Sequence, residues 1–242
     1  MKRISAIFIS LCLLCGCAAL PDGGNVSQTD ARPAQSAQST VSHEEKYSKI
    51  VACGIDVSCW QESVDWARVA TDNVDFAIIR AGFSGDTDAC FEENYSGATA
   101  AGIDVGLYFY CYAVTVDEAK ADAEYLLGLL NGRKLDYPVF YDIEDDPDFL
   151  ALTRDERTEI ADAFCTVVEQ AGYEAGIYTG RYWLSDYFDS DYLSAKYDVW
   201  LAAPLPEPPT ECSAEIWQYS HTGRIKGIDG DVDLNTAYKK YK

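Results

Sequence analysis

Short apolar segments alternate with longer amphipathic segments through most of the chain after residue 49. The short segments are typical of buried strands, and the longer ones have the spacing of helices with one apolar face. Strands are predicted at residues 54–58, 75–81, 105–110, 139–143 and 174–178. Helices are predicted between them at residues 91–101, 116–130 and 154–171. Strands that alternate with helices in this way indicate a parallel sheet with crossover connections.

An internal repeat supports the parallel arrangement. Residues 101–108 read AGIDVGLY and residues 171–178 read AGYEAGIY. Each copy places a glycine just after a predicted helix, where a left-handed C-cap is favoured, and then begins a strand that ends near tyrosine. The helix before the second copy also begins with a capping-box sequence, in which Glu156 follows Thr153 at the third position.

The pattern changes after Trp183, where strands are separated by loops instead of convincing long helices. These strands are predicted at residues 198–202 and 216–219 and around Val232. The total is about eight strands and about five helices. An incomplete α/β barrel of the TIM type fits this order better than an open doubly wound sheet, which is the alternative fold.

The N-terminus has the features of an export signal. Lys2 and Arg3 precede an apolar run that ends near Leu14 and is too short to span a bilayer as a mature helix. The run closes with Leu-x-Gly-Cys, which resembles a bacterial lipoprotein box in which Cys17 is lipidated. A plain signal peptide cut at small residues is the alternative. Lipidation of Cys17 would place an exported protein on the bacterial cell membrane, facing the cell wall.

Composition divides the chain into three parts. Residues 1–16 are predicted to be a lipoprotein signal peptide, and residues 17–49, rich in Ala, Ser, Gln and Thr, a flexible tether. Residues 50–242 are predicted to form the catalytic barrel. This part contains six cysteines: Cys53, Cys59, Cys90, Cys111, Cys165 and Cys212. Cys59 and Cys90 lie in loops that follow neighbouring strands, so we expect them to form a disulfide, and we expect Cys165 to be a buried free thiol.

Net charge and the scarcity of histidine exclude several functions. A formal net charge of -21 repels nucleic-acid phosphates, so we expect no nucleic-acid partner and no membrane contact besides a lipid anchor. Only His43 and His221 are present, and the sequence around His221 reads as a turn, which favours a surface histidine over a catalytic one. Paired-histidine metal motifs are absent from the sequence, and we expect no metal, no cofactor and a monomer.

Two carboxylates at the end of one strand are the strongest candidates for catalysis. In the segment PVFYDIE, alternation places Asp142 and Glu144 on the same face as Phe140. In a barrel this face points to the axis, at the rim where active sites lie. Two like charges on one face raise the pKa of one of them, which provides the proton donor and the anion that general acid catalysis needs. The alternative is a helix N-cap beside a solvated loop acid.

Further candidates surround the same rim. Asp56 lies inside an apolar strand, Asp231 and Asp233 lie beside the last strand, and Arg80 is an inward cation that could balance their charge. Aromatic residues at or near the strand ends are suited to stacking against sugar rings. They are Tyr108, Tyr110, Tyr178, Trp200 and Trp217.

The ordered set of motifs resembles glycoside hydrolase family 25, the muramidases often called Chalaropsis-type lysozymes. The motifs are GIDVS followed by WQ, then FAIIRAG, GLY, DIE, GIY, IWQY and VDLN, in this order between residues 54 and 235. The resemblance implies a flattened TIM-like barrel of eight strands and five helices. It also implies hydrolysis of peptidoglycan glycan strands at the β-1,4 bond between N-acetylmuramic acid and N-acetylglucosamine.

The resemblance also implies roles for four acids. Glu144 matches the proton donor, and Asp142 matches the acid that assists the acetamido group of the substrate. Asp56 and Asp233 match two further acids of the cleft, since Asp233 and not Asp231 fits the Val-Asp-x-Asn pattern. We expect a retaining, substrate-assisted reaction; an aspartate nucleophile is the alternative. A chitinase-like N-acetylhexosaminidase and an inactive wall-binding protein are the competing functions.

Overall fold

The computed structural model describes residues 49–144, 146–209 and 213–241. Its strands are β1 (Ala52–Val57), β2 (Phe76–Phe83), β3 (Asp86–Thr87), β4 (Asp104–Tyr110), β5 (Val139–Asp142), β6 (Ala175–Gly180), β7 (Asp198–Ala202), β8 (Ile216–Gly223) and β9 (Val232–Ala237). Its α-helices are α2 (Trp66–Val69), α3 (Phe91–Ala100), α4 (Val116–Leu130), α5 (Pro147–Leu150), α6 (Arg154–Gln170), α7 (Arg181–Tyr187) and α8 (Ser190–Lys196). A 3₁₀ helix, η1 (Cys59–Gln61), follows β1.

Eight of the strands form a closed barrel. Their order is β1-β9-β8-β7-β6-β5-β4-β2, and β1 also pairs with β2. All neighbours are parallel except β9, which is antiparallel to β8 and β1, and the short β3 extends the end of β2. The predicted α/β barrel is therefore confirmed. The described residues contain seven α-helices instead of about five, because α2, α5, α7 and α8 have four or seven residues each and are too short to show a helical period.

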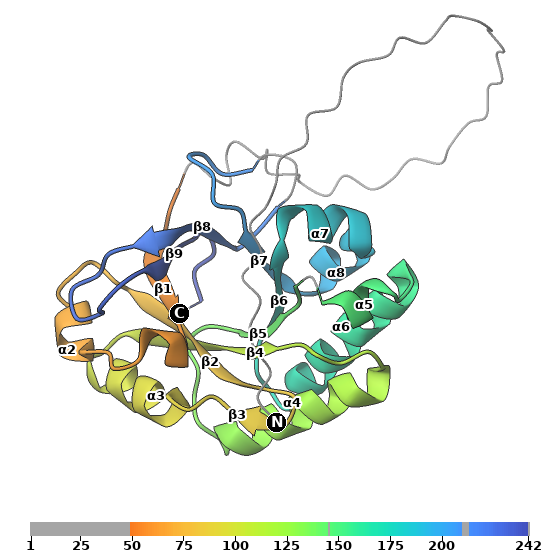
Figure 1. Cartoon of the computed structure of the whole chain (residues 1–242), viewed down its shortest axis with the longest axis horizontal. Coiled ribbons are helices and arrows are strands. Elements are labelled where there is room, and N and C mark those ends of the chain that lie inside the picture. The colour runs from red at the N-terminus through yellow and green to blue at the C-terminus, as the bar shows by residue number, and fades with distance from the viewer. Residues whose placement is uncertain (1–48, 145, 210–212, 242) are drawn as a thin grey trace, which may run out of the picture. The chain divides into compact units, whose positions relative to one another are not determined.

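Helices α3, α4 and α6 lie outside the barrel (Figure 1). Helix α4 and strand β7 have the predicted bounds, and Thr153 and Glu156 form the predicted capping box of α6. The core between the barrel and the helices includes Tyr141 of β5, whose ring stacks on Phe164 of α6 with centroids 3.9 Å apart. The opposite face of the same strand points into the barrel, where Phe140 packs on Trp200. The alternation in β5 therefore separates packing residues from residues that face the barrel axis.

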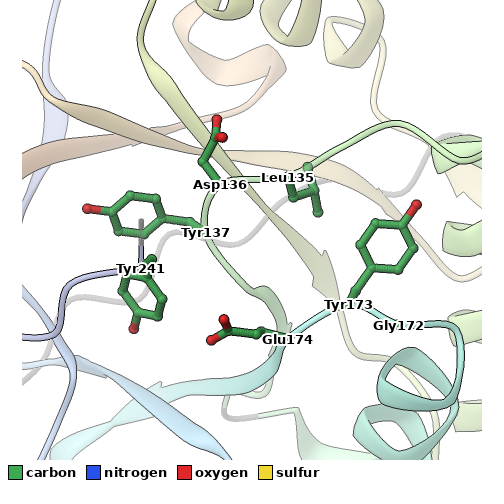
Figure 2. Close-up of a pocket in the computed structure, with 7 residues that line it drawn as sticks. All are labelled: Leu135, Asp136, Tyr137, Gly172, Tyr173, Glu174 and Tyr241. Atoms are coloured by element: carbon green, nitrogen blue, oxygen red, sulfur yellow. The ribbon is translucent and has the colours of Figure 1, made fainter.

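Acids and tyrosines close the N-terminal end of the barrel. Asp136 accepts a hydrogen bond from the backbone N–H of Val105, and Glu215 accepts one from Val199 in the same way. A hollow of about 200 Å³ lies at this end. Figure 2 shows the residues that line it, among them Tyr137 and Tyr241. The rings of these two tyrosines are in contact, with centroids 4.6 Å apart. These acids therefore accept hydrogen bonds from backbone N–H groups where the strands begin.

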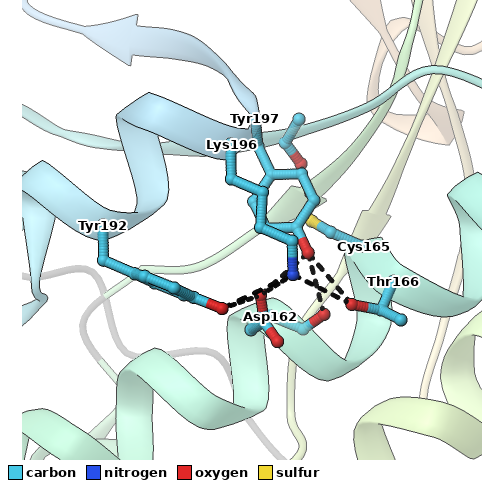
Figure 3. A network of polar contacts seen from close by, with 7 residues as sticks. Asp162, Cys165, Thr166, Tyr192, Lys196 and Tyr197 are labelled. Atoms are coloured by element: carbon cyan, nitrogen blue, oxygen red, sulfur yellow. Dashed lines mark hydrogen bonds and ion pairs between the residues drawn. The ribbon is translucent and has the colours of Figure 1, made fainter.

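A polar network fastens α8 to α6, as Figure 3 shows. Lys196 Nζ lies 2.5 Å from Asp162 Oδ1, and the hydroxyls of Tyr192 and Tyr197 donate to the same oxygen at 2.9 and 2.8 Å. Hydrogen bonding to Asp162 raises the pKa of Lys196, so the pair stays charged at neutral pH. Residues of two helices separated in sequence are thereby held together beside β7.

Asp122 on α4 is a buried acid outside the cleft. The Tyr141 hydroxyl donates a hydrogen bond to Asp122 Oδ2 at 2.8 Å. Burial raises the pKa of Asp122 to about 6, in spite of the opposing effect of that hydrogen bond. The folded protein therefore binds a proton at Asp122 more tightly than the unfolded chain does. The free energy of unfolding consequently falls as the pH rises from about 4 through about 6.

Asp122→Asn keeps an acceptor for Tyr141 and removes the charge. We expect the free energy of unfolding of this variant minus that of wild type to be about 1–2 kcal/mol larger at pH 8 than at pH 4, allowing for solvent screening. Urea denaturation at the two pH values measures the difference. Glu124→Gln, an exposed change on the same helix, is the matched control. A difference for Asp122→Asn that does not change with pH would contradict the role of its charge.

Candidate active site

The predicted catalytic residues meet in one cleft at the C-terminal ends of the parallel strands. The cleft has a volume of about 190 Å³. Its lining contains all four predicted acids, the predicted cation and four of the five predicted aromatic residues. The lining residues are Asp56, Trp60, Arg80, Tyr108, Tyr110, Asp142, Glu144, Tyr178, Trp200 and Asp233. Trp217 is buried elsewhere, where its indole Nε1 donates to the carbonyl of Ala203 at 2.7 Å.

Asp56 is a buried carboxylate on β1, directly opposite Asp233 of β9. Its Oδ2 accepts hydrogen bonds from Gln218 Nε2 at 2.9 Å and from Asn235 Nδ2 at 2.8 Å. Burial raises the pKa of Asp56 to about 7, and the charge of Asp233 adds to this shift, while the two amide donors oppose it. Asp56 is therefore poised between its neutral and charged forms near neutral pH.

Two aromatic side chains set the orientation of these amides. Trp200 Nε1 donates to Asn235 Oδ1 at 2.8 Å, and the Tyr178 hydroxyl donates to Gln218 Oε1 at 2.9 Å. Because an indole N–H can only donate, the oxygen of Asn235 must face Trp200, which leaves its NH₂ group for Asp56. Trp200 is 1% exposed and Tyr178 is 7% exposed. In this structure both rings support the acids of the cleft and present little surface to a sugar.

Asp142 ends β5 and is 4% exposed. Its Oδ1 is buried and has no hydrogen-bond partner within the described part of the chain. Burial raises the pKa of Asp142 well above its usual range, and the charges of Glu144 and Asp56 act in the same direction. Glu144 lies two residues further on, half-buried in the lining of the cleft. Ionisation of both carboxyl groups at once is therefore unfavourable.

Arg80 supplies positive charge at the cleft, but its guanidinium is already paired. Arg80 Nε donates to Asp88 Oδ2 at 2.7 Å, and Arg80 Nη2 lies 3.2 Å from Cys59 Sγ. Asp88 is fully buried and also accepts from the backbone N–H groups of Cys59 and Cys90. The loops of these two cysteines therefore meet, as the sequence predicts. The expected disulfide is not formed in the structure: both thiols are free, and Cys90 Sγ faces the carbonyl of Glu62 at 3.5 Å.

Three aromatic side chains besides Trp200 and Tyr178 line the cleft. Trp60 is 76% exposed, on η1, which a capping box between Ser58 and Gln61 holds in place. Tyr108 and Tyr110 project from the end of β4. An exposed indole beside buried acids is suited to stacking on a sugar ring. Trp60 is therefore the aromatic residue of the cleft with the largest free surface.

A family model, that of glycosyl hydrolases family 25, matches residues 55–228. The chain belongs to this family. The family 25 chain is 33% identical to lysozyme M1 of Streptomyces globisporus over 195 residues, which cover 75% of this chain and 66% of that protein. It is 28% identical to the autolytic lysozyme of Clostridium acetobutylicum over 185 residues, which cover 75% of this chain and 54% of that protein. It thus spans about half to two thirds of the length of these relatives.

Solved structures show the same fold. The modular autolysin LytC of Streptococcus pneumoniae aligns with a TM-score of 0.69 and 27% identity over 76% of this chain and 46% of that one. A bacterial lysozyme from Streptomyces coelicolor aligns with a TM-score of 0.65 and 27% identity over 78% of this chain and 93% of that one. The barrel of the family 25 chain is therefore shared with enzymes described as an autolysin and a lysozyme.

Four residues of the site had no functional role in the sequence prediction. Gln218 and Asn235 lie within recognised motifs, but nothing in the sequence shows that both amides reach Asp56. Trp60 also lies within a motif, and its exposure depends on η1. His221 was predicted to be a surface residue in a turn; it is exposed as predicted, but it lies in β8, and its Nδ1 is 3.2 Å from Asp233 Oδ1. That contact is a property of strand register, which residue type does not reveal.

Proposed function

We propose that this family 25 enzyme is a peptidoglycan hydrolase that cleaves the β-1,4 bond between N-acetylmuramic acid and N-acetylglucosamine. The observation that carries the proposal is Asp142 Oδ1, a buried acceptor that lacks a partner within the described residues and lies beside Glu144 in the cleft. The acetamido N–H of an N-acetylated sugar can donate a hydrogen bond to this oxygen. LytC of Streptococcus pneumoniae has been solved with a synthetic peptidoglycan ligand, which supports this class of substrate.

Glu144 and Asp142 then act in sequence. A hydrogen bond from the acetamido N–H favours the charged form of Asp142. The negative charge of Asp142 then favours the protonated form of Glu144. Glu144 donates that proton to the leaving oxygen while the acetamido carbonyl oxygen attacks the anomeric carbon. Water later opens the cyclic intermediate, with Glu144 as the base, and the configuration is retained. Asp56 and Asp233 line the same cleft, where their carboxylates can stabilise positive charge that develops on the sugar.

The bond that is cut can be read from the new reducing ends. Purified peptidoglycan is digested, reduced with borohydride and analysed by mass spectrometry. Muramitol ends would support a muramidase, whereas glucosaminitol ends or cleavage of chitin oligomers would indicate a different N-acetylhexosaminidase. If cell walls bind the protein but release no fragments, the chain is a wall-binding protein and the proposed activity is wrong.

Export and anchoring are also proposed, and they rest on the N-terminal sequence. Cys17 lies outside the described residues, as do the predicted signal peptide and nearly all of the tether. Within residues 49–144, 146–209 and 213–241, no helix combines the length and apolar composition needed to cross a membrane. On the basis of the Leu-x-Gly-Cys sequence, we propose that acyl chains on Cys17 are the membrane anchor.

Replacement of Cys17 by serine should abolish anchoring. We expect wild-type protein expressed in a bacterium to partition into the detergent phase of Triton X-114, and Cys17→Ser to remain uncleaved or to appear in the aqueous phase. Cys15→Ser, which leaves the last residue of the box intact, is the matched control. Wild-type protein found wholly in the aqueous phase would show that the box is not used.

A further inference from the structure

The end of β8 contains a β-bulge. Gln218 pairs with Asn235, and Ser220 pairs with Leu234. The pairing thus advances by two residues on β8, from 218 to 220, and by one on β9, from 235 to 234. Tyr219 is therefore an extra residue, and the faces of the strand are exchanged for the residues directly after it. A second irregularity follows, since the next pair is Gly223 with Val232, three residues further along β8 but two along β9.

The bulge decides where His221 points. Leu234 packs with the core between barrel and helices, so Ser220, opposite Leu234, shares that outer face. The next residue, His221, then shares the inner face with Asp233, and its Nδ1 lies 3.2 Å from Asp233 Oδ1. In a regular strand, Ser220 would follow Gln218 on the inner face and His221 would point outward. Bulges beside active sites commonly redirect a side chain in this way.

Asp233, whose carboxylate His221 contacts, lies beside another acid. Asp233 lies directly opposite Asp56 across the β1–β9 pair, and like charges in opposed positions are destabilising. The groups whose charges act on His221 are Asp233 of β9, Asp56 of β1 and Glu144 after β5, and all three are acids. The hydrogen bond to Asp233 raises the pKa of His221 above its ordinary value.

Other cations near the cleft have partners of their own. Arg80 is bound to the buried Asp88. Arg224, three residues beyond His221, forms an ion pair with Asp231, and neither lines the cleft. Among the ion pairs of the described residues, the partner of Asp233 is His221.

We propose that His221 is a positioning residue of the catalytic cleft, whose imidazolium orients Asp233 and favours the ionised form of the neighbouring Asp56. The proposal rests on the proposed function in one respect, namely that the two aspartates act as anions in catalysis. While His221 is protonated, its charge lowers the pKa of Asp56, which burial and the charge of Asp233 raise. His221 therefore extends activity toward lower pH.

The pH dependence of kcat tests this role. Without the imidazolium, Asp56 keeps its proton to a higher pH. We expect the acidic limb of the profile for His221→Gln to move upward by about one pH unit, which is about a tenfold loss of kcat on that limb. At alkaline pH, above the raised pKa of His221, the variant and wild type should differ by less than about twofold, with KM little changed.

Two further variants separate an electrostatic role from a structural one. His221→Arg restores a permanent cation and should return the acidic limb to the wild-type pH or below it. Arg224→Gln removes a positive charge from the same hairpin and should leave the profile unchanged. An unshifted limb for His221→Gln would overturn the proposal. A loss that is equal at every pH and is not restored by arginine would overturn it as well.

A titration that does not use activity tests the contact itself. The chain has only two histidines, so the ring C–H signals of His221 can be assigned in proton NMR by comparison with His221→Gln. We expect the pKa of His221 to fall in Asp233→Asn, since the carboxylate that raises it is removed. An unchanged pKa would overturn the proposal even if the enzyme cleaves peptidoglycan. A fall in an enzyme without muramidase activity would leave the contact supported and reject the proposed function alone.

Discussion

Glu144→Gln should lose activity on peptidoglycan by about 10²–10⁴-fold in kcat, because the amide keeps the shape of the side chain but cannot donate a proton to the leaving oxygen. Glutamine has nearly the same shape as glutamate, and Glu144 is only half-buried in the cleft, so folding should be preserved. Release of soluble fragments from purified cell walls, followed over time, measures the loss. Circular dichroism and the thermal midpoint establish that the variant is folded.

Glu118→Gln is a suitable control for this substitution. Glu118 is an exposed residue in the first turn of α4 and lies outside the cleft. Its variant should retain full activity. If folded Glu144→Gln also retains near-full activity, Glu144 is not the proton donor, and the proposed reaction fails at its first step.

A substrate with a free amine in place of the acetamido group at the cleaved sugar should be hydrolysed at least about 10²-fold more slowly, because the internal nucleophile is missing. Asp142→Asn should lose about 10²–10³-fold on the acetylated substrate, since its carboxylate no longer stabilises the reacting acetamido group. On the free-amine substrate the same variant should lose much less. The two effects are therefore expected to be strongly non-additive, because both remove the same interaction.

The comparison is made with one glycan preparation before and after chemical removal of the acetyl groups. Initial rates are measured for wild type and Asp142→Asn on both forms. Equal rates of wild type on both forms would exclude participation of the acetamido group. Additive losses, or a trapped glycosyl ester on Asp56 or Asp142, would favour an aspartate nucleophile, which is the alternative retaining mechanism.

The sequence by itself determined the features that depend on local pattern. The alternation in residues 139–142 placed Asp142 on the inner face of β5, because a strand has a period of two residues wherever it lies, and Glu144 follows two residues beyond the end of that strand. The bounds of α4 and the capping box of α6 followed from short-range spacing. Repeated strand-helix units favoured a barrel but left an open doubly wound sheet as the alternative, and the pairing of β1 with β2 decided that the sheet closes.

Tertiary structure alone decided how these parts meet. Asp56 and Asp233 are 177 positions apart in the chain and become direct neighbours only through the β1–β9 pairing. Likewise, burial of Trp200 turned an expected sugar platform into a support for Asn235. The short helices were missed because four to seven residues contain too little pattern. The contact of His221 with Asp233 was missed for a related reason: an extra residue in β8 changes the face on which the next side chains lie, and only the register with β9 reveals it.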